Sequence, residues 1–337
     1  MRIGVVGCGR IGARRARIAF AAGDVVSTVA DLDGERADAL ASEAGASVAG
    51  WQDVVTNCEV DAVVVATHNK SLFPVALAAL DAGKHVLCEK PLGRNSVEAR
   101  DLVEAADAAG VILKTGFNHR YHPAISSAHD LVRSGGIGPP LFIRAAYGHG
   151  GRPGYDKEWR GDPELAGGGE LLDQGVHLVD LCRWFLGDFV EVSGSLATWF
   201  WDVAPLEDNA FAMLRTAAGQ LASIHSSWTQ WKNVFRFEIF GRDGYVTIEG
   251  LGGSYGPPSL IHGRRRAESG PPEETEQKFP SDDRTWDLEW NDFLGAIAEQ
   301  RRPLGDGRDG LAAARVIDAI YASAQKGSPV TLDPADR

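Results

Sequence analysis

Three side chains of this 337-residue chain have types and a spacing suited to moving a proton. Lys90 follows the short apolar run 85–88, and Asp173 and His177 are four residues apart. Residues at that spacing are neighbours on one face of a helix. A lysine, a carboxylate and an imidazole that meet at one hydroxyl group could take its proton while a hydride leaves the same carbon. We therefore take Lys90, Asp173 and His177 as the candidate catalytic residues.

The segment in front of Lys90 has the pattern of a dinucleotide-binding unit. An apolar run ends at Gly7-Cys8-Gly9-Arg10-Ile11-Gly12, a helical pattern and a second apolar run follow, and Asp31 closes that run. The acid comes about 20 residues after the glycines, as this fingerprint requires. Gly7 permits a tight turn, Gly9 lets the backbone approach a pyrophosphate, and Gly12 lets helix and strand pack closely. Asp31 can accept hydrogen bonds from both ribose hydroxyls of NAD and would repel the extra phosphate of NADP, so the pattern predicts NAD.

Apolar runs alternate with helical patterns in this first part of the chain, which predicts an α/β fold with a doubly wound parallel sheet. After Asp31 we expect helices at 34–44, 51–57, 72–82 and 96–109, and strands at 61–66, 85–88 and 111–115. Thr67 and Asn69 follow one of these strands at its carboxyl end, where open α/β sheets bind ligands.

The second part of the chain predicts more strands and fewer helices. We expect helices at 124–134, from near 169 to 185, at 286–299 and at 310–324. We expect strands at 141–147, 190–202, 209–216, 219–229, 233–241 and 245–249. Residues 148–168 form a long loop, and loops of such length are usually functional. No element is assigned to 250–283, which is rich in Gly, Pro and charge; Arg264–Arg266 in it could grip a phosphate but is interpreted as a solvated charge run.

Composition excludes several classes of partner. The net charge is -12, which disfavours nucleic acid and anionic membranes. No apolar run reaches the ~20 residues of a membrane span, and no leader precedes the first strand, so we expect a cytoplasmic protein. Cys8, Cys58, Cys88 and Cys182 form no CxxC pair, and no third ligand accompanies Asp173 and His177, so we expect no metal.

These motifs, in this order, resemble the Gfo/Idh/MocA oxidoreductase family, named for glucose–fructose oxidoreductase, inositol dehydrogenase and a rhizopine-catabolism protein. The resemblance covers nearly all of the chain and rests on the glycine turn and on segments 82–92, 117–124, 159–160 and 167–180. It implies a Rossmann domain at 1–120, followed at 121–337 by an α+β domain with an open, mostly antiparallel sheet. The closing helices at 286–325 would be able to pack back on the first domain. The exposed sheet face commonly forms dimers or tetramers in relatives, so we expect a homodimer or homotetramer.

The resemblance also implies residue roles. Lys90 matches the family's lysine after the sheet, Asp173 its helix aspartate, and His177 its acid/base histidine. Trp159 and Arg160 match a loop that reaches the nicotinamide end in relatives. Cofactor contacts are expected from Gly7, Gly9, Arg10, Ile11, Gly12, Asp31, Thr67, Asn69, Glu89, Lys90, Asn118, Trp159 and Arg160. Substrate contacts are expected from Lys90, Arg120, Tyr121, Tyr155, Asp173 and His177. The chain departs from the family pattern at His68, Phe73 and His119, where relatives often carry Pro, His and Arg.

The predicted function is an NAD-dependent interconversion of a secondary alcohol and a ketone on a sugar or cyclitol ring, such as an inositol, a hexose or an amino sugar. The polar groups of loop 147–168 suit a polyhydroxylated ring. One alternative is a nucleotide-sugar dehydrogenase or ketoreductase, whose diphosphate would need cations such as Arg264–Arg266. The others are a dihydrodiol or imine reductase and a non-catalytic dinucleotide-binding regulator on the same fold.

Overall fold

A computed structural model describes residues 1–332 of the chain, which divides into two compact units. Unit 1 comprises residues 1–118, 164–167 and 286–314. Unit 2 comprises 119–163, 168–285 and the described residues from 315 onward. None of the helices in the described part of the chain is both long enough and apolar enough to cross a membrane.

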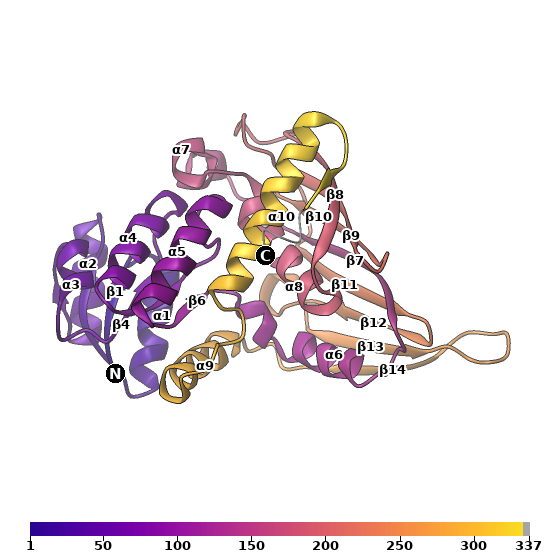
Figure 1. The fold of residues 1–337 in the computed structure, drawn as a ribbon, viewed down its shortest axis with the longest axis horizontal. Helices are drawn as coiled ribbons and strands as arrows, with labels where there is room; N and C mark the ends of the chain where they lie inside the picture. The colour runs from indigo at the N-terminus through magenta and orange to yellow at the C-terminus, as the bar shows by residue number, and fades with distance from the viewer. Residues whose placement is uncertain (333–337) are drawn as a thin grey trace. The chain divides into compact units, whose positions relative to one another are not determined.

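Unit 1 is built on a six-stranded parallel sheet with the order β3-β2-β1-β4-β5-β6 (Figure 1). Its central strand β4 reads Ala-Val-Val-Val and is buried throughout, as expected of a parallel strand covered on both faces. The strands are β1 Arg2–Val6, β2 Val25–Ala30, β3 Ser47–Val48, β4 Ala62–Val65, β5 His85–Cys88 and β6 Leu113–Thr115.

The helices of unit 1 cover both faces of this sheet. Alternate strand residues point to opposite faces, and they fall into two separate core clusters: Val5 and Val64 in one, Val6 and Val65 in the other. Trp290 and Phe293 of the late helix α9 complete the first cluster. The helices are α1 Arg10–Ala21, α2 Gly34–Ala44, α3 Trp51–Thr56, α4 Asn69–Asp81, α5 Ser96–Ala109, α7 Pro163–Ala166 and α9 Thr285–Glu299.

Local signals set the ends of several helices. Asp33 and Asn95 accept backbone N–H groups at the starts of α2 and α5, and Gly45 and Gly110 end these helices in the left-handed conformation. Both helices match their predicted ranges. Helix α4 begins at Asn69, three residues before its predicted start, so Asn69 lies in the first turn of the helix.

Unit 2 is built on a nine-stranded sheet with the order β14-β13-β12-β11-β7-β10-β9-β8-β15, as described within residues 1–332. Its strands pair antiparallel except β7 and β10, which are parallel. The predicted fold class is confirmed: a doubly wound parallel sheet followed by an open, mostly antiparallel one. The strands are β7 Pro140–Gly148, β8 Phe189–Ala197, β9 Asn209–Thr216, β10 Leu221–Ser227, β11 Val234–Gly241, β12 Gly244–Glu249, β13 Ser259–Arg264, β14 Glu273–Lys278 and β15 Val330–Thr331.

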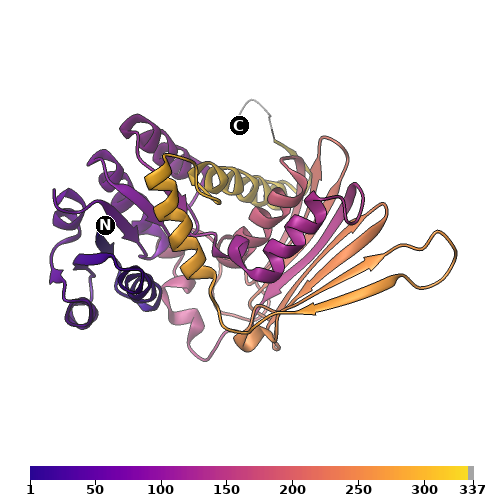
Figure 2. The ribbon, with the colours of Figure 1, turned by 90° about the horizontal axis from the view of Figure 1, so that it is seen from below.

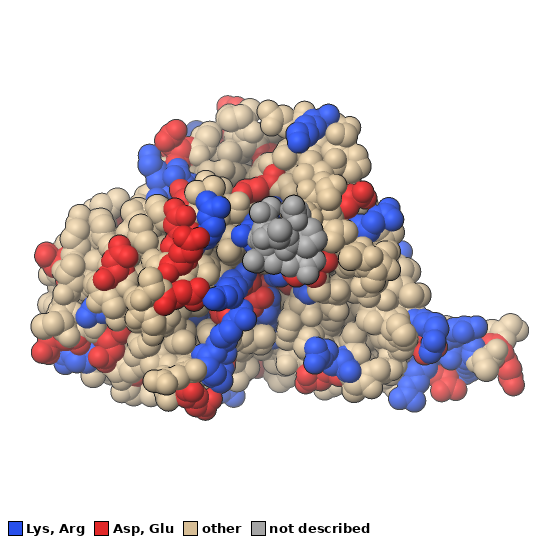
Figure 3. Space-filling model, in the orientation of Figure 1, with Lys and Arg blue, Asp and Glu red and all other residues tan. Residues whose placement is uncertain are grey.

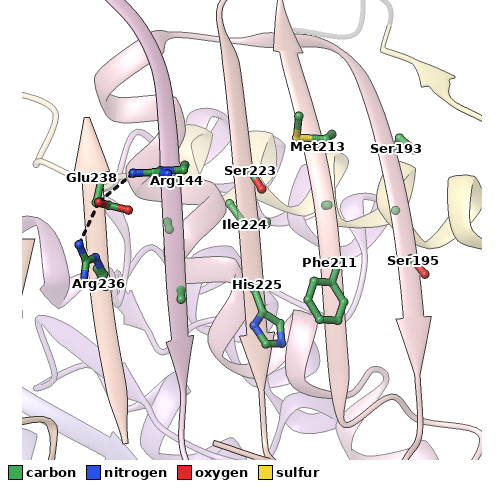
Figure 4. Close-up of a pocket in the computed structure, with 14 residues that line it drawn as sticks. Arg144, Ser193, Ser195, Phe211, Met213, Ser223, Ile224, His225, Arg236 and Glu238 are labelled. Carbon is green, nitrogen blue, oxygen red and sulfur yellow. Dashed lines mark hydrogen bonds and ion pairs between the residues drawn. The ribbon is translucent and has the colours of Figure 1, made fainter. Parts of the chain in front are cut away.

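Helices α6 (Pro123–Arg133) and α8 (Val176–Leu186) lie against one face of the nine-stranded sheet (Figure 2). The other face carries the alternate residues of the same strands, among them Phe211, Met213 and His225 (Figure 4). Phe211 and Met213 are about half exposed, at 40% and 46%. Helix α10, Gly307–Lys326, has its first residues in unit 1 and the remainder in unit 2.

Two sequence expectations for unit 2 need correction. Residues 250–283, to which no element was assigned, contain a hairpin of β13 and β14 that projects from the sheet edge (Figure 1). Strand β14 reads Glu-Glu-Thr-Glu-Gln-Lys and is exposed throughout, so it lacks the apolar alternation that marks a strand. Figure 3 shows basic and acidic side chains intermingled on this hairpin, where Arg266 pairs with Glu273.

The second correction concerns the predicted helix from near 169 to 185. Residues Leu171–Gly175 form a π-helical turn, and the regular helix α8 begins only at Val176. Single π-helical turns are rare and occur often at functional sites. The remaining short turns are 3₁₀ helices, at Asn118–Tyr121 (η1), Tyr155–Lys157 (η2), Trp159–Gly161 (η3) and Gly253–Tyr255 (η5); the π-helical turn is η4.

Candidate active-site residues

The glycine turn of unit 1 has the geometry of a phosphate cradle. A Cβ placed on Gly12 would lie 1.7 Å from the carbonyl oxygen of Gly7, so only glycine fits there. A Cβ on Gly9 would meet nothing within 4 Å, so this face of the turn is open to a ligand. Gly9 is also the N-cap of α1 and supplies no side-chain cap, which leaves the first N–H groups of the helix to bind an anion.

Asp31 lies directly beside this turn. Its carboxylate accepts the backbone N–H of Cys8 at 2.6 Å and that of Asp33 at 2.9 Å. These two bonds hold the carboxylate at the carboxyl end of β2, next to the glycines. Arg10 is exposed and Ile11 is half-buried in the first turn of α1. The cradle, the open side of Gly9 and the acid together fit the diphosphate and ribose of NAD.

Glu89 and Lys90 follow β5, but their surroundings differ. Glu89 is buried and accepts two hydrogen bonds from Arg15, at 2.9 and 2.7 Å. Arg15 is itself buried and also pairs with Glu289 at 2.5 Å. Glu89, expected to contact the cofactor, is thus part of a buried ionic network that joins α1, β5 and α9. Lys90 is half-buried.

The other expected cofactor residues of unit 1 lie at the carboxyl ends of its strands. The Asn69 side-chain amide is buried and donates to the carbonyl of Ala166 at 2.9 Å, which ties α4 to α7. The Thr67 hydroxyl donates to the carbonyl of His68 at 3.1 Å. Asn118 is buried and starts the turn after β6.

Asp173 and His177 are both buried in unit 2, with 6% and 3% of their surfaces exposed. The structure places Asp173 in the π-helical turn and His177 in the first turn of α8. Arg160 donates from Nε to Oδ2 of Asp173 at 2.9 Å. Burial alone would lower the pKa of Arg160, but the Asp173 carboxylate raises it, so the guanidinium stays charged. This pair was not predicted, because no sequence pattern links a loop residue to one 13 positions later.

Loop 148–168 is therefore structured rather than open. It contains η2, η3 and α7, and the guanidinium of Arg160 lies over the ring of Trp159, 4.3 Å from its centroid. Tyr155 is buried, with its ring edge-on to Trp228 at 5.2 Å. Burial, and then the charge of Asp173, raises the pKa of Tyr155, so its hydroxyl stays protonated.

Two further tyrosines lie beside these residues and were not singled out from the sequence. Tyr147 of β7 is buried, and its ring centroid is 5.4 Å from that of Tyr255 in η5. Burial, and then Tyr255, raises the pKa of Tyr147 well above its ordinary value. Burial also raises the pKa of Tyr255, to about 12. The charges of Glu170 and Asp173 raise the pKa values of both tyrosines further, so both hydroxyls stay protonated over the physiological pH range.

The turn at residues 118–121 directs its two basic side chains to different partners: His119 contacts His177, and Arg120 contacts Asp180. The His119 ring stacks on the His177 ring, with centroids 3.9 Å apart and 25° between the planes. Arg120, an expected substrate residue, is buried and makes two bonds to Asp180, at 2.9 and 2.6 Å. Its guanidinium is thus engaged in an internal ion pair. Tyr121 is half-buried in the same turn.

Comparison with known proteins follows the same division of the chain. Residues 1–117 match the oxidoreductase family model with an NAD-binding Rossmann fold, and residues 125–247 match the GFO/IDH/MocA C-terminal domain.

The chain belongs to the Gfo/Idh/MocA oxidoreductase family. Inositol 2-dehydrogenase 2 of Saccharopolyspora erythraea is 31% identical to it over 99% of this chain and 96% of that protein. Levoglucosan dehydrogenase of Pseudarthrobacter phenanthrenivorans is 26% identical over 85% of this chain and 83% of that protein. A levoglucosan dehydrogenase structure in complex with NADH and L-sorbose superposes with a TM-score of 0.90 at 25% identity, covering 99% of both chains.

Membership of the Gfo/Idh/MocA family makes this chain an oxidoreductase with an NAD-binding Rossmann fold, as the sequence predicted. Within the described residues, no group of three or more His, Cys, Asp or Glu side chains is arranged to hold a metal ion.

Proposed function

We propose that this protein interconverts a secondary alcohol and a ketone on a neutral or amino-bearing sugar or cyclitol, with NAD as the hydride acceptor. The observation that carries the proposal is the pair of buried side chains Asp173 and His177, with the half-buried Arg160 bound to Asp173, in a chain whose other unit carries an open dinucleotide cradle. Relatives named for inositol and levoglucosan dehydrogenation support the substrate class.

In the oxidation direction, His177 takes the proton of the reacting hydroxyl as a general base. Asp173, fixed by Arg160, favours the charged form of the imidazole that results. Lys90 donates a hydrogen bond to the same oxygen and stabilises the charge that develops on it. NAD, when bound, accepts the hydride from the carbon as the C=O bond forms. Reduction of the ketone uses the same groups in reverse.

The residues of the turn and of loop 148–168 have proposed binding roles. Gly9, Arg10, Ile11 and the N-terminus of α1 would bind the diphosphate, and Asp31 the ribose. The side chains proposed to line the cofactor are Trp159, Thr67, Asn69 and Asn118, whereas Arg160 acts through Asp173. Tyr121 is a proposed substrate contact. Tyr155, which is buried against Trp228, supports loop 148–168.

The position of the arginine cluster favours a substrate without a nucleotide. Arg264 pairs with Gly244 at one end of β12, whereas Phe235, which packs near His119, pairs with Tyr147 toward the other end of β11. Strand β13 is also separated from β7 by β12 and β11. With strands about 4.8 Å apart, the cluster lies roughly 14 Å from β7 across the sheet alone. This separation supports a substrate whose recognition does not use Arg264–Arg266 of the same subunit.

The uncovered sheet face supports a homo-oligomer, either a dimer or a tetramer. Phe211 and Met213 of β9 expose apolar surface there, and Arg144 and Glu238, whose side chains pair at 3.1 Å, lie on the same face across β10 (Figure 4). A mass measurement by light scattering would decide the oligomeric state. We also propose that the protein works in the cytoplasm, and that residues 1–120 and 121–337 are its two functional domains, with 286–325 returning to the first.

The test is a spectrophotometric screen of NAD reduction against inositols, free hexoses, amino sugars and nucleotide sugars. Turnover of at least one free or aminated ring, unaffected by Arg265→Ala, is the expected result. Turnover confined to nucleotide sugars and abolished by Arg265→Ala would replace the proposal with a nucleotide-sugar dehydrogenase. NAD binding without turnover of any compound would favour a dinucleotide-binding regulator.

A further inference from the structure

Two imidazole rings lie face to face in unit 2. His119, in the turn before α6, stacks on His177 of α8 with centroids 3.9 Å apart and an angle of 25°. Both side chains are buried, with 9% and 3% of their surfaces exposed. The His119 ring also packs against Tyr147 and Phe235, with centroids 5.4 and 5.9 Å away, and Tyr147 flanks the His177 ring as well, at 6.3 Å. His119 is therefore packed against side chains of β7 and β11 as well as against His177, and its ring covers one face of the His177 imidazole.

Several charged and titratable groups surround this pair of rings. Asp173 lies in the π-helical turn that leads into α8, with Arg160 of η3 bound to it. Tyr147 of β7 has its ring centroid 6.3 Å from that of His177, and Tyr255 of η5 lies behind it. The helix of His177 also carries Asp180, which is neutralised by Arg120. Glu170 adds a further carboxylate whose charge reaches Tyr147.

We propose that His119 is a positioning residue for His177: its ring fixes the plane of the His177 imidazole, and the two stacked rings hold one proton between them. The inference rests on the proposed role of His177 as acid and base. Two imidazolium rings in face-to-face contact repel each other strongly in a buried place. Because Asp173 is in the π-helical turn that leads directly into the helix of His177, we assign the first proton to His177, and His119 stays neutral while His177 takes up and releases its proton.

A neutral partner ring has a clear use during turnover. Groups that interact this closely titrate as a pair, in two separate steps. In the step at higher pH, His177 binds the catalytic proton. In the step at lower pH, the second proton binds to the pair, and repulsion by the first moves this step to more acidic pH. The stacked ring meanwhile keeps the imidazole aligned, and misalignment by about 1 Å can cost about 10²-fold in rate.

The titration can be followed by NMR of histidine ring carbons in the whole protein, without substrate. Each of the variants His119→Phe and His177→Phe keeps one histidine of the pair and replaces the other with an aromatic ring that cannot bind a proton. The ring that titrates at lower pH in the wild type should shift upward by more than about one pH unit when the other ring becomes Phe. Equal midpoints in the wild type, or a midpoint that stays unchanged in the Phe variant, would overturn the shared proton.

Kinetics test the orientation. His119→Ala should lower kcat about tenfold or more, with the KM for the sugar changed less than about threefold, and His119→Phe should recover most of the lost kcat. His129→Ala is the matched control, because it removes a histidine ring stacked on Trp184, with centroids 3.7 Å apart, rather than one stacked on His177; it should leave kcat unchanged. Equal losses in the Ala and Phe variants would overturn the positioning role. Absence of any sugar turnover by the wild type would refute the proposed function instead and leave the titration result standing.

Discussion

At the scale of single residues, we propose that the Asp31 carboxylate sets the preference for NAD over NADP. Asp31 is held beside the glycine turn by the N–H groups of Cys8 and Asp33. A 2′-phosphate in that place would meet a fixed negative charge. Asp31→Ser should narrow the preference for NAD over NADP, because it removes the repulsion and keeps a hydroxyl acceptor. The ratio of kcat/KM for the two cofactors measures this effect.

Asp33→Ser provides the control, because Asp33 caps α2 and Ser also caps helices well. It should leave the cofactor ratio within about twofold of wild type. If NADP already equals NAD in the wild type, Asp31 does not select the cofactor.

Arg160 and Arg152 lie in the same loop; Arg160 donates to Asp173, and Arg152 pairs with Glu158. Arg160→Ala removes the donor to the Asp173 carboxylate and leaves a buried acid without this cation. We expect kcat to fall by at least about tenfold, because the orientation and charge of Asp173 support His177. Arg152, which is exposed and pairs with Glu158 at 2.5 Å, should tolerate Ala with activity within about twofold. Equal activities of the two variants would contradict the role given to Arg160.

At the residue scale the sequence supplies candidates for the site: Lys90, Asp173 and His177 are selected from their types and motifs, and their catalytic roles are proposals. The ion pair of Arg160 with Asp173 and the stack of His119 on His177 could not be selected in this way, because both depend on how separate turns meet in the folded unit. From the sequence, Glu89 was expected to contact the cofactor and Arg120 the substrate. In the structure Glu89 forms an ion pair with the buried Arg15, and Arg120 forms one with the buried Asp180.

Among the elements, the turn between β1 and α1 is closed at Gly12, where a Cβ would lie 1.7 Å from the carbonyl oxygen of Gly7, and open at Gly9. Gly9→Ala should fold normally, because its Cβ would meet no atom within 4 Å, but it should weaken NAD binding by placing a methyl group where the pyrophosphate approaches. We expect the free energy of unfolding to change by less than about 0.5 kcal/mol. Denaturant unfolding and calorimetric NAD binding separate the two effects.

Gly34→Ala is the matched control for this prediction. Gly34 also has open space around its Cβ position, and it begins α2 rather than the helix whose N-terminus faces the pyrophosphate. It should alter neither stability nor NAD binding beyond the same small margin. Unchanged NAD affinity in Gly9→Ala would show that the pyrophosphate does not approach this residue.

The strands and helices of unit 1 lie close to their predicted ranges. Buried parallel strands give unbroken apolar runs, and capping residues at both ends mark helices α2 and α5. Strand β14 was missed because an edge strand with both faces in water needs no apolar residue. The π-helical turn at 171–175 was missed because one extra residue per turn leaves no trace in an apolar pattern.

For the whole molecule, buried histidines make stability depend on pH. Burial lowers the pKa of His122 from 6.5 to about 4, and burial also lowers the pKa values of His85, His129 and His225. Between pH 4 and 6.5 the unfolded chain binds a proton at His122 and the folded chain does not. Stability is therefore lost as pH falls through this window, by roughly 3 kcal/mol from His122 alone.

His122→Asn should flatten this loss. Denaturant unfolding at several pH values from about 4 to 8 measures the slope of the unfolding free energy in both proteins. Above about pH 7 the two slopes should agree, because His122 is neutral in both the folded and the unfolded wild-type chain. A slope below pH 6.5 that remains unchanged in the variant would show that His122 is protonated in the folded protein.

The central claim is that His177 moves the proton of a sugar or cyclitol hydroxyl during transfer of a hydride to NAD. The most direct test is the single-turnover rate of NAD reduction by His177→Ala with a substrate that the wild type oxidises, measured alongside NAD affinity. We predict a rate at least about 10²-fold below wild type with NAD affinity retained, because His177 belongs to unit 2 and the dinucleotide turn to unit 1. A rate within a few-fold of wild type, with NAD bound equally well, would contradict the assignment.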